Sequence, residues 1–111
     1  MDYYVIGERE LVLGFSLAGV QGQAVTSREE ALDAFNRMTG QLSAKANIAA
    51  QDRPKVLILT EEVSDMLSKE VLDWQMGGAS PLIVEVQGLS GHIAGRKTLT
   101  DSIREAIGIQ V

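Results

Sequence analysis

The sequence predicts an α/β fold: a single open sheet of four parallel strands with helices packed against its faces. Two observations predict it. Short β-rich runs alternate with longer segments of helical periodicity along the chain. Two of the runs, residues 55–60 and 82–86, are almost continuously apolar, as expected for strands buried on both faces. We expect right-handed crossovers between the strands and the spatial order 2-1-3-4.

Composition excludes several classes of function. The chain has 111 residues and a formal net charge of −5, without a basic stripe, so nucleic acid is not expected as a partner. It contains no cysteine, which excludes disulfides, thiol nucleophiles and thiolate metal sites. No secretory signal is evident and no apolar run reaches the length that a membrane crossing needs. We therefore expect a cytosolic protein with no direct membrane insertion.

The first β-rich run turns at Gly7 into a helix that Gly19 is expected to end. Its apolar residues at helical spacing are Leu11, Val12, Phe15 and Ala18. Residues 20–25 form a weaker second strand, in which Gln21 and Gln23 alternate with small or apolar residues. This alternation predicts an exposed edge strand.

The second helix has the clearest start, because Ser27 is followed three residues later by Glu30, the pattern of a capping box. Its predicted apolar face consists of Ala31, Leu32, Phe35, Met38 and Leu42. Residues 43–51 contain helix formers but few apolar ones, and we interpret them as a loose extension of this helix that stops before Pro54.

After the central strand at 55–60, Glu61 and Glu62 are expected to open a third helix that runs to Gly77-Gly78. Its predicted inner face is Val63, Met66, Leu67, Val71 and Trp74. Trp74 has two interpretations, a residue of the core or its edge and an exposed anchor at an interface.

The last part of the chain is predicted to be less firmly attached. Gly88, Gly91 and Gly95 interrupt the connection that follows the fourth strand, and residues 97–107 are expected to form a C-terminal helix. One side of that helix carries Leu99, Ile103, Ala106 and Ile107. We accordingly divide the chain into an α/β sandwich at 1–87 and a flexible connection with a helix at 88–111.

Ligands of open α/β sheets usually bind at the carboxyl ends of the strands. The residues expected there are Gly7, Glu8, Arg9, Thr60, Glu61 and Glu62. Their carboxylates could hold a hard cation such as Mg²⁺, or could simply favour the starts of two helices. A response-regulator receiver shares this architecture but needs an aspartate where this chain has Thr60 or Glu61. His92, the one histidine, stands in the connection without a second imidazole or a nucleophile beside it. No catalytic, cofactor-binding or metal-binding set emerges.

Four runs, in this order and spacing, resemble the F subunit of the V-type and archaeal-type rotary ATPases. They are Val5-Ile6-Gly7-Glu8-Arg9-Glu10 with the following residues to Val20, Leu57-Ile58-Leu59-Thr60-Glu61-Glu62, Pro81-Leu82-Ile83-Val84-Glu85-Val86, and Ile103-Arg104-Glu105-Ala106-Ile107-Gly108-Ile109. The resemblance covers nearly the whole chain.

The resemblance implies a non-catalytic component of the central stalk, the rotor of the ATPase. Such a component binds the long coiled-coil D subunit, and the pair turns inside the A/B nucleotide-binding headpiece above the membrane rotor. It couples ATP hydrolysis or synthesis to H⁺ or Na⁺ transport, needs no cofactor, and lies on the cytoplasmic side, peripheral to the membrane. The more mobile C-terminal helix implies a regulatory role.

The sequence suggests where a partner would bind. We expect the glycine-rich connection and the apolar side of the last helix to contribute Gly88, Gly91, Leu99, Ile103 and Ile107. The same apolar side could instead pack on the chain's own sheet. A second hypothesis for the function is a receiver-like α/β module that senses a divalent cation or small ligand through Glu8, Glu61 and Glu62.

Overall fold

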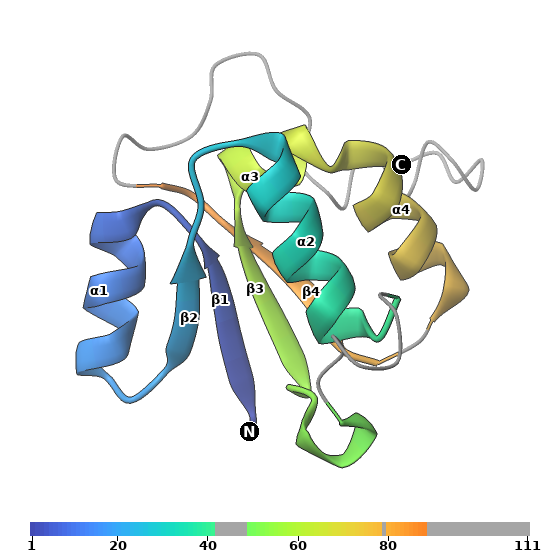
Figure 1. Cartoon of the computed structure of the whole chain (residues 1–111), viewed down its shortest axis with the longest axis horizontal. Coiled ribbons are helices and arrows are strands. Elements are labelled where there is room, and N and C mark those ends of the chain that lie inside the picture. The colour runs from blue at the N-terminus through green and yellow to red at the C-terminus, as the bar shows by residue number, and fades with distance from the viewer. Residues whose placement is uncertain (42–48, 79, 89–111) are drawn as a thin grey trace, which may run out of the picture.

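The computed structural model describes residues 1–41, 49–78 and 80–88. Four parallel strands form one sheet in the order β2-β1-β3-β4 (Figure 1), which confirms the predicted α/β fold and strand order. In chain order the elements are β1 (Tyr3–Gly7), α1 (Arg9–Leu17), β2 (Gln21–Ala24), α2 (Arg28–Thr39), the 3₁₀ turn η1 (Ala50–Asp52), β3 (Val56–Thr60), α3 (Glu61–Met66), α4 (Ser68–Gly77) and β4 (Leu82–Val86). The predicted C-terminal helix, His92 and most of the glycine-rich connection lie outside the described residues.

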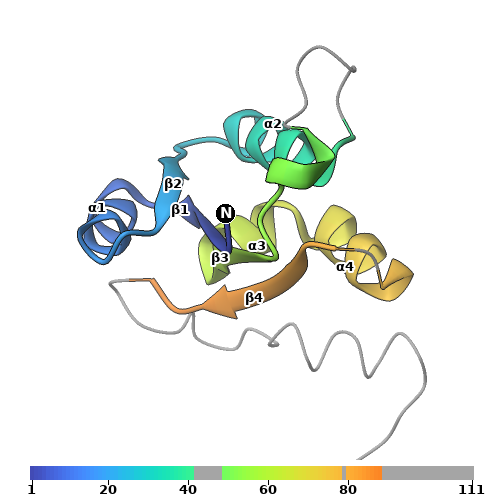
Figure 2. The ribbon, with the colours of Figure 1, turned by 90° about the horizontal axis from the view of Figure 1, so that it is seen from below.

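The helices are divided unequally between the two faces of the sheet. Among the described elements, Figure 2 shows α2, α3 and α4 together on one face and α1 on the other. On the first face, the core face, the sheet contributes Tyr4, Ile6, Leu57, Leu59 and Ile83 to the main hydrophobic cluster. The intervening residues of each strand point to the second face, which we call the α1 face.

The main core lies between the sheet and the three helices of the core face. Its helical members are Ala31, Ala34, Phe35, Met38, Val63, Leu67 and Val71. Trp74 packs against this cluster, meeting Phe35 edge to face at 6.5 Å between ring centroids. Its indole Nε1 donates to the carbonyl oxygen of Pro81 at 2.9 Å. Trp74 is therefore a residue of the core edge, as one of its two interpretations had it.

The start of α2 differs in detail from the predicted capping box. Ser27 Oγ accepts from the N–H of Glu30 at 3.2 Å, as expected. The Glu30 carboxylate, however, accepts from Thr26, from its N–H at 3.1 Å and its hydroxyl at 2.6 Å, and not from Ser27. The reciprocal bond is thus displaced by one residue, because the Thr26 hydroxyl offers the carboxylate a second donor. These two bonds lower the pKa of Glu30.

α2 ends at Gly40, before Leu42 and the loose extension predicted at residues 43–51. Gly40 caps the helix with φ of 77°, a left-handed conformation that terminates helices. Residues 42–48 lie outside the described part of the chain, and η1 then precedes the central strand.

The predicted third helix is two helices. The chain leaves helical geometry at Leu67, between α3 and α4, where φ is −113° and ψ is 27°. Arg28 lies across this break, donating from Nε to the Met66 carbonyl oxygen and pairing with the Glu70 carboxylate. The break lets the predicted inner residues Val63 and Val71 both reach the core as the chain turns across the sheet.

The prediction that β4 is buried on both faces is wrong. It is an edge strand, and only Ile83 among its five residues is buried. Leu82 and Val84, on the α1 face, are 53% and 38% exposed. A continuous apolar run therefore identified the strand correctly, but its burial depended on a covering layer that the described residues do not provide there.

We predict a pH dependence that comes from the cap of α2. Because the folded-state pKa of Glu30 lies below its ordinary value of 4.5, its contribution to stability is complete above that pH and is lost as the pH falls through the folded-state pKa. Glu30→Gln should therefore be less stable than the wild type at pH 7, and the difference should shrink as the pH is lowered below 4.5. Urea unfolding over this pH range measures the effect.

The matched control is Glu29→Gln, which removes a neighbouring carboxylate in the same first helical turn but leaves the Thr26 bonds intact. An equal, pH-independent loss of stability in Glu30→Gln and Glu29→Gln would contradict the assignment.

Candidate functional site

The carboxyl end of the sheet, where the sequence placed a possible ligand site, is closely packed. A Cβ at Gly7 would stand 2.5 Å from Thr60 Cγ2, so the turn after β1 fits only a glycine. Thr60 in turn caps α3, because its hydroxyl accepts from the N–H of Val63 at 3.3 Å. Glycine at position 7 therefore lets β1 and β3 end side by side while Thr60 still caps α3.

Glu8 connects this edge to the end of β4. A Cβ at Gly88 would stand 2.5 Å from Glu8 Oε1, so the carboxylate lies directly over the Gly88 backbone. Gly88 is thus placed beside the start of α1. The other predicted partner-binding residues, Gly91, Leu99, Ile103 and Ile107, lie outside the described residues.

The three glutamates considered as cation ligands have different surroundings. Glu61 is buried at the start of α3, Glu62 is exposed, and Glu8 lies over Gly88. Within residues 1–41, 49–78 and 80–88, no three or more acidic or histidine side chains are grouped to hold a metal ion. The described residues therefore give the cation-sensing hypothesis no site.

The unusual feature of the fold is α1. Five of its nine residues are large and apolar, Leu11, Val12, Leu13, Phe15 and Leu17, yet none of the nine is buried. Val12 faces the sheet, since a Cβ at Gly22 would meet its Cγ1 at 3.1 Å. Leu13 and Leu17 are 54% and 91% exposed. Of the apolar residues noted at helical spacing, Leu11, Val12 and Phe15 are half-buried and Ala18 is exposed.

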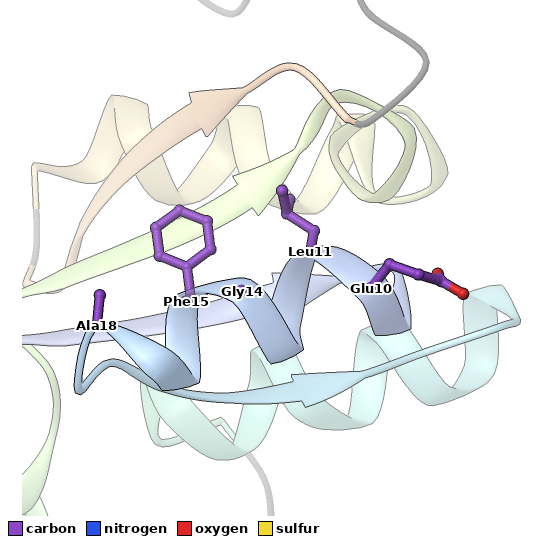
Figure 3. A pocket seen from close by; sticks show the side chains of 5 residues that line it. All are labelled: Glu10, Leu11, Gly14, Phe15 and Ala18. Carbon is purple, nitrogen blue, oxygen red and sulfur yellow. The ribbon is translucent and has the colours of Figure 1, made fainter.

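Leu11 and Phe15 border an open hollow along α1. Figure 3 shows both side chains on the same side of the helix, with Gly14 and Ala18 beside them and Glu10 at one end. The hollow measures about 330 Å³. The exposed side chains of Tyr3, Leu82 and Val84 belong to the same side of the sheet. The α1 face thus carries most of the exposed apolar surface that the described residues provide.

No helix within the described ranges combines the length and the apolar content that a membrane crossing requires.

Comparison with known proteins identifies the family. Residues 4–107 match the family described as ATP synthase (F/14-kDa) subunit. The chain belongs to this family. It is 30% identical over 111 residues to the A-type ATP synthase F subunit of Thermococcus kodakarensis, covering 100% of this chain and 98% of that protein. The A-type F subunits of Methanocaldococcus jannaschii and Methanothermobacter thermautotrophicus are 29% and 28% identical, covering 100% and 96% of this chain and 99% and 92% of their own lengths.

The family assignment confirms the resemblance seen in the sequence. The exposed α1 surface was missed there because the spacing of Leu11, Val12, Phe15 and Ala18 indicates a single buried face. One signal in the sequence could have indicated this apolar surface. Leu13 and Leu17 make the helix apolar on further sides, and a helix that is apolar all round is normally buried. In this family member that helix lies at the surface.

We predict that Gly7→Ala destabilises the fold by about 1–3 kcal/mol, because the new methyl group overlaps the Thr60 side chain. Adding Thr60→Ser should restore much of the loss, since serine keeps the capping hydroxyl and lacks the Cγ2 methyl group. Urea unfolding of the single and double variants measures both effects.

Gly77→Ala is the control, because no described atom lies within 4 Å of a Cβ there. If Thr60→Ser fails to relieve Gly7→Ala, close packing at this edge is not the reason for the glycine.

Proposed function

We propose that this chain is a non-catalytic component of the central stalk of a V/A-type rotary ATPase. In this proposal it binds the coiled-coil D subunit and, through it, the A/B headpiece and the membrane rotor. It transmits rotation that couples ATP hydrolysis or synthesis to H⁺ or Na⁺ transport. The complex places it at the cytoplasmic side, peripheral to the membrane.

The observation that carries the proposal is the family match across residues 4–107. The distribution of the described side chains supports it. The carboxyl edge, where an α/β enzyme would bind its ligand, is occupied by packing between Gly7 and Thr60 and by Glu8 over Gly88. Exposed apolar side chains gather instead on the α1 face, a distribution that favours binding of another protein.

The proposal retains the predicted C-terminal contact, in which residues 88–111 supply Gly88, Gly91, Leu99, Ile103 and Ile107. Energetic arguments require more than this segment. Burying three such apolar side chains contributes on the order of 1.5–3 kcal/mol each. Association costs an estimated ~4–15 kcal/mol, and ordering a helix adds to that cost. The α/β body must therefore supply part of the contact.

Co-purification tests the proposal. The full-length chain, co-expressed with the D subunit of the same organism, should elute from size-exclusion chromatography as a one-to-one complex by light scattering. The variant Leu99→Ser with Ile103→Ser should retain the complex but weaken it at least tenfold, because the body still binds.

Separate elution of the two folded, full-length proteins would refute the stalk assignment. Affinity unchanged by the double variant would leave the assignment intact and remove the C-terminal segment from the contact.

A further inference from the structure

We propose that α1 is the ridge on which a coiled coil docks, with the two helices of the partner straddling it. This inference rests on the proposed function, because it identifies the surface of the α/β body that would bind the coiled-coil partner. It assigns a role to a helix that contains none of the predicted partner-binding residues.

The shape of α1 supports a partner with two helices. Successive residues of an α-helix are about 100° apart, and Val12 marks the side that faces the sheet. The line farthest from the sheet is then Glu10, Gly14 and Ala18, all exposed. Leu11 and Phe15 stand on one flank of this line, and Leu13 and Leu17 stand on the other. A single helix packed against either flank would leave the other flank uncovered, whereas a helix pair covers both.

The small residues on the outer line make that approach possible. Gly14 lies within the helix, where glycine weakens the fold relative to alanine. The fold does not require it, because no described atom lies within 4 Å of a Cβ at that position and its φ is not positive. Without a side chain at Gly14, and with only a methyl group at Ala18, the ridge can enter the groove between two helices.

Charge identifies the partner further. Glu10 is the one carboxylate on the outer line, exposed at the end of the hollow that Leu11 and Phe15 border. The chain as a whole carries a net charge of −5. A complementary coiled coil has apolar residues along the groove and a Lys or Arg opposite Glu10. The exposed Leu82 and Val84 add apolar surface on the same face of the sheet as α1.

Two substitutions test the ridge, with the purified D subunit as the probe and the full-length chain throughout. Gly14→Gln places a side chain on the outer line, and Leu17→Gln replaces an apolar side chain that is 91% exposed. Each should weaken binding, measured by isothermal titration calorimetry, by at least tenfold. Gly14→Gln alone should melt at or above the wild-type temperature, because it replaces a glycine inside a helix.

The matched controls lie on α4, on the opposite face of the sheet (Figure 2). Gly77→Gln substitutes a second glycine with open surroundings, and Met76→Gln removes a second exposed apolar side chain. Both should bind the partner within threefold of the wild type. Weakening by the α1 variants and not by the α4 variants supports the proposal.

Other results overturn it in distinguishable ways. If the wild type binds and all four variants bind equally well, α1 is not the docking ridge, although the stalk assignment stands. If the wild type does not bind at all, the proposed function fails and the ridge with it. A lower melting temperature for isolated Gly14→Gln would assign the surface to the chain's own C-terminal segment. A wild-type dimer that Gly14→Gln dissociates would assign it to a second copy.

Discussion

The handedness of the crossovers between parallel strands decides which face each helix of this fold can cover. The chain moves from β1 outward to β2, and then returns past β1 to β3 and β4. Right-handed connections in these two opposite directions place α1 on one face and α2, α3 and α4 on the other. The main core therefore lies on the face with three helices, while α1 alone covers the opposite face among the described elements (Figure 2). The exposed apolar surface of the molecule follows from that asymmetry.

This asymmetry connects the fold to its proposed role in a stalk. The core face secures stability through a single cluster that extends from Tyr4 to Ile83 and includes the buried Phe35 and Met38 of α2. The α1 face can then present Leu13 and Leu17 to a partner without weakening that cluster, because neither belongs to it. In the proposed stalk role, the core face supplies the rigid body and the α1 face supplies the surface that binds the partner.

The sequence was most informative where a local signal determined the structure. The Ser27 cap, the helix end at Gly78 and the central strand β3 all depend on residues close together in the chain. It was less informative where tertiary packing decided. The break at Leu67 is bridged by Arg28, 38 residues before the Met66 carbonyl that it binds. The exposure of β4 and α1 depends on the layers around them, which periodicity alone does not reveal.

Docking on α1 can be followed by hydrogen–deuterium exchange of the full-length chain, alone and bound to the coiled-coil D subunit. Binding should slow amide exchange in α1, Arg9–Leu17, and leave α4, Ser68–Gly77, unchanged. Comparable protection of both helices would indicate general stabilisation of the fold. Protection of α4 without α1 would contradict docking on α1 and place the partner on the core face.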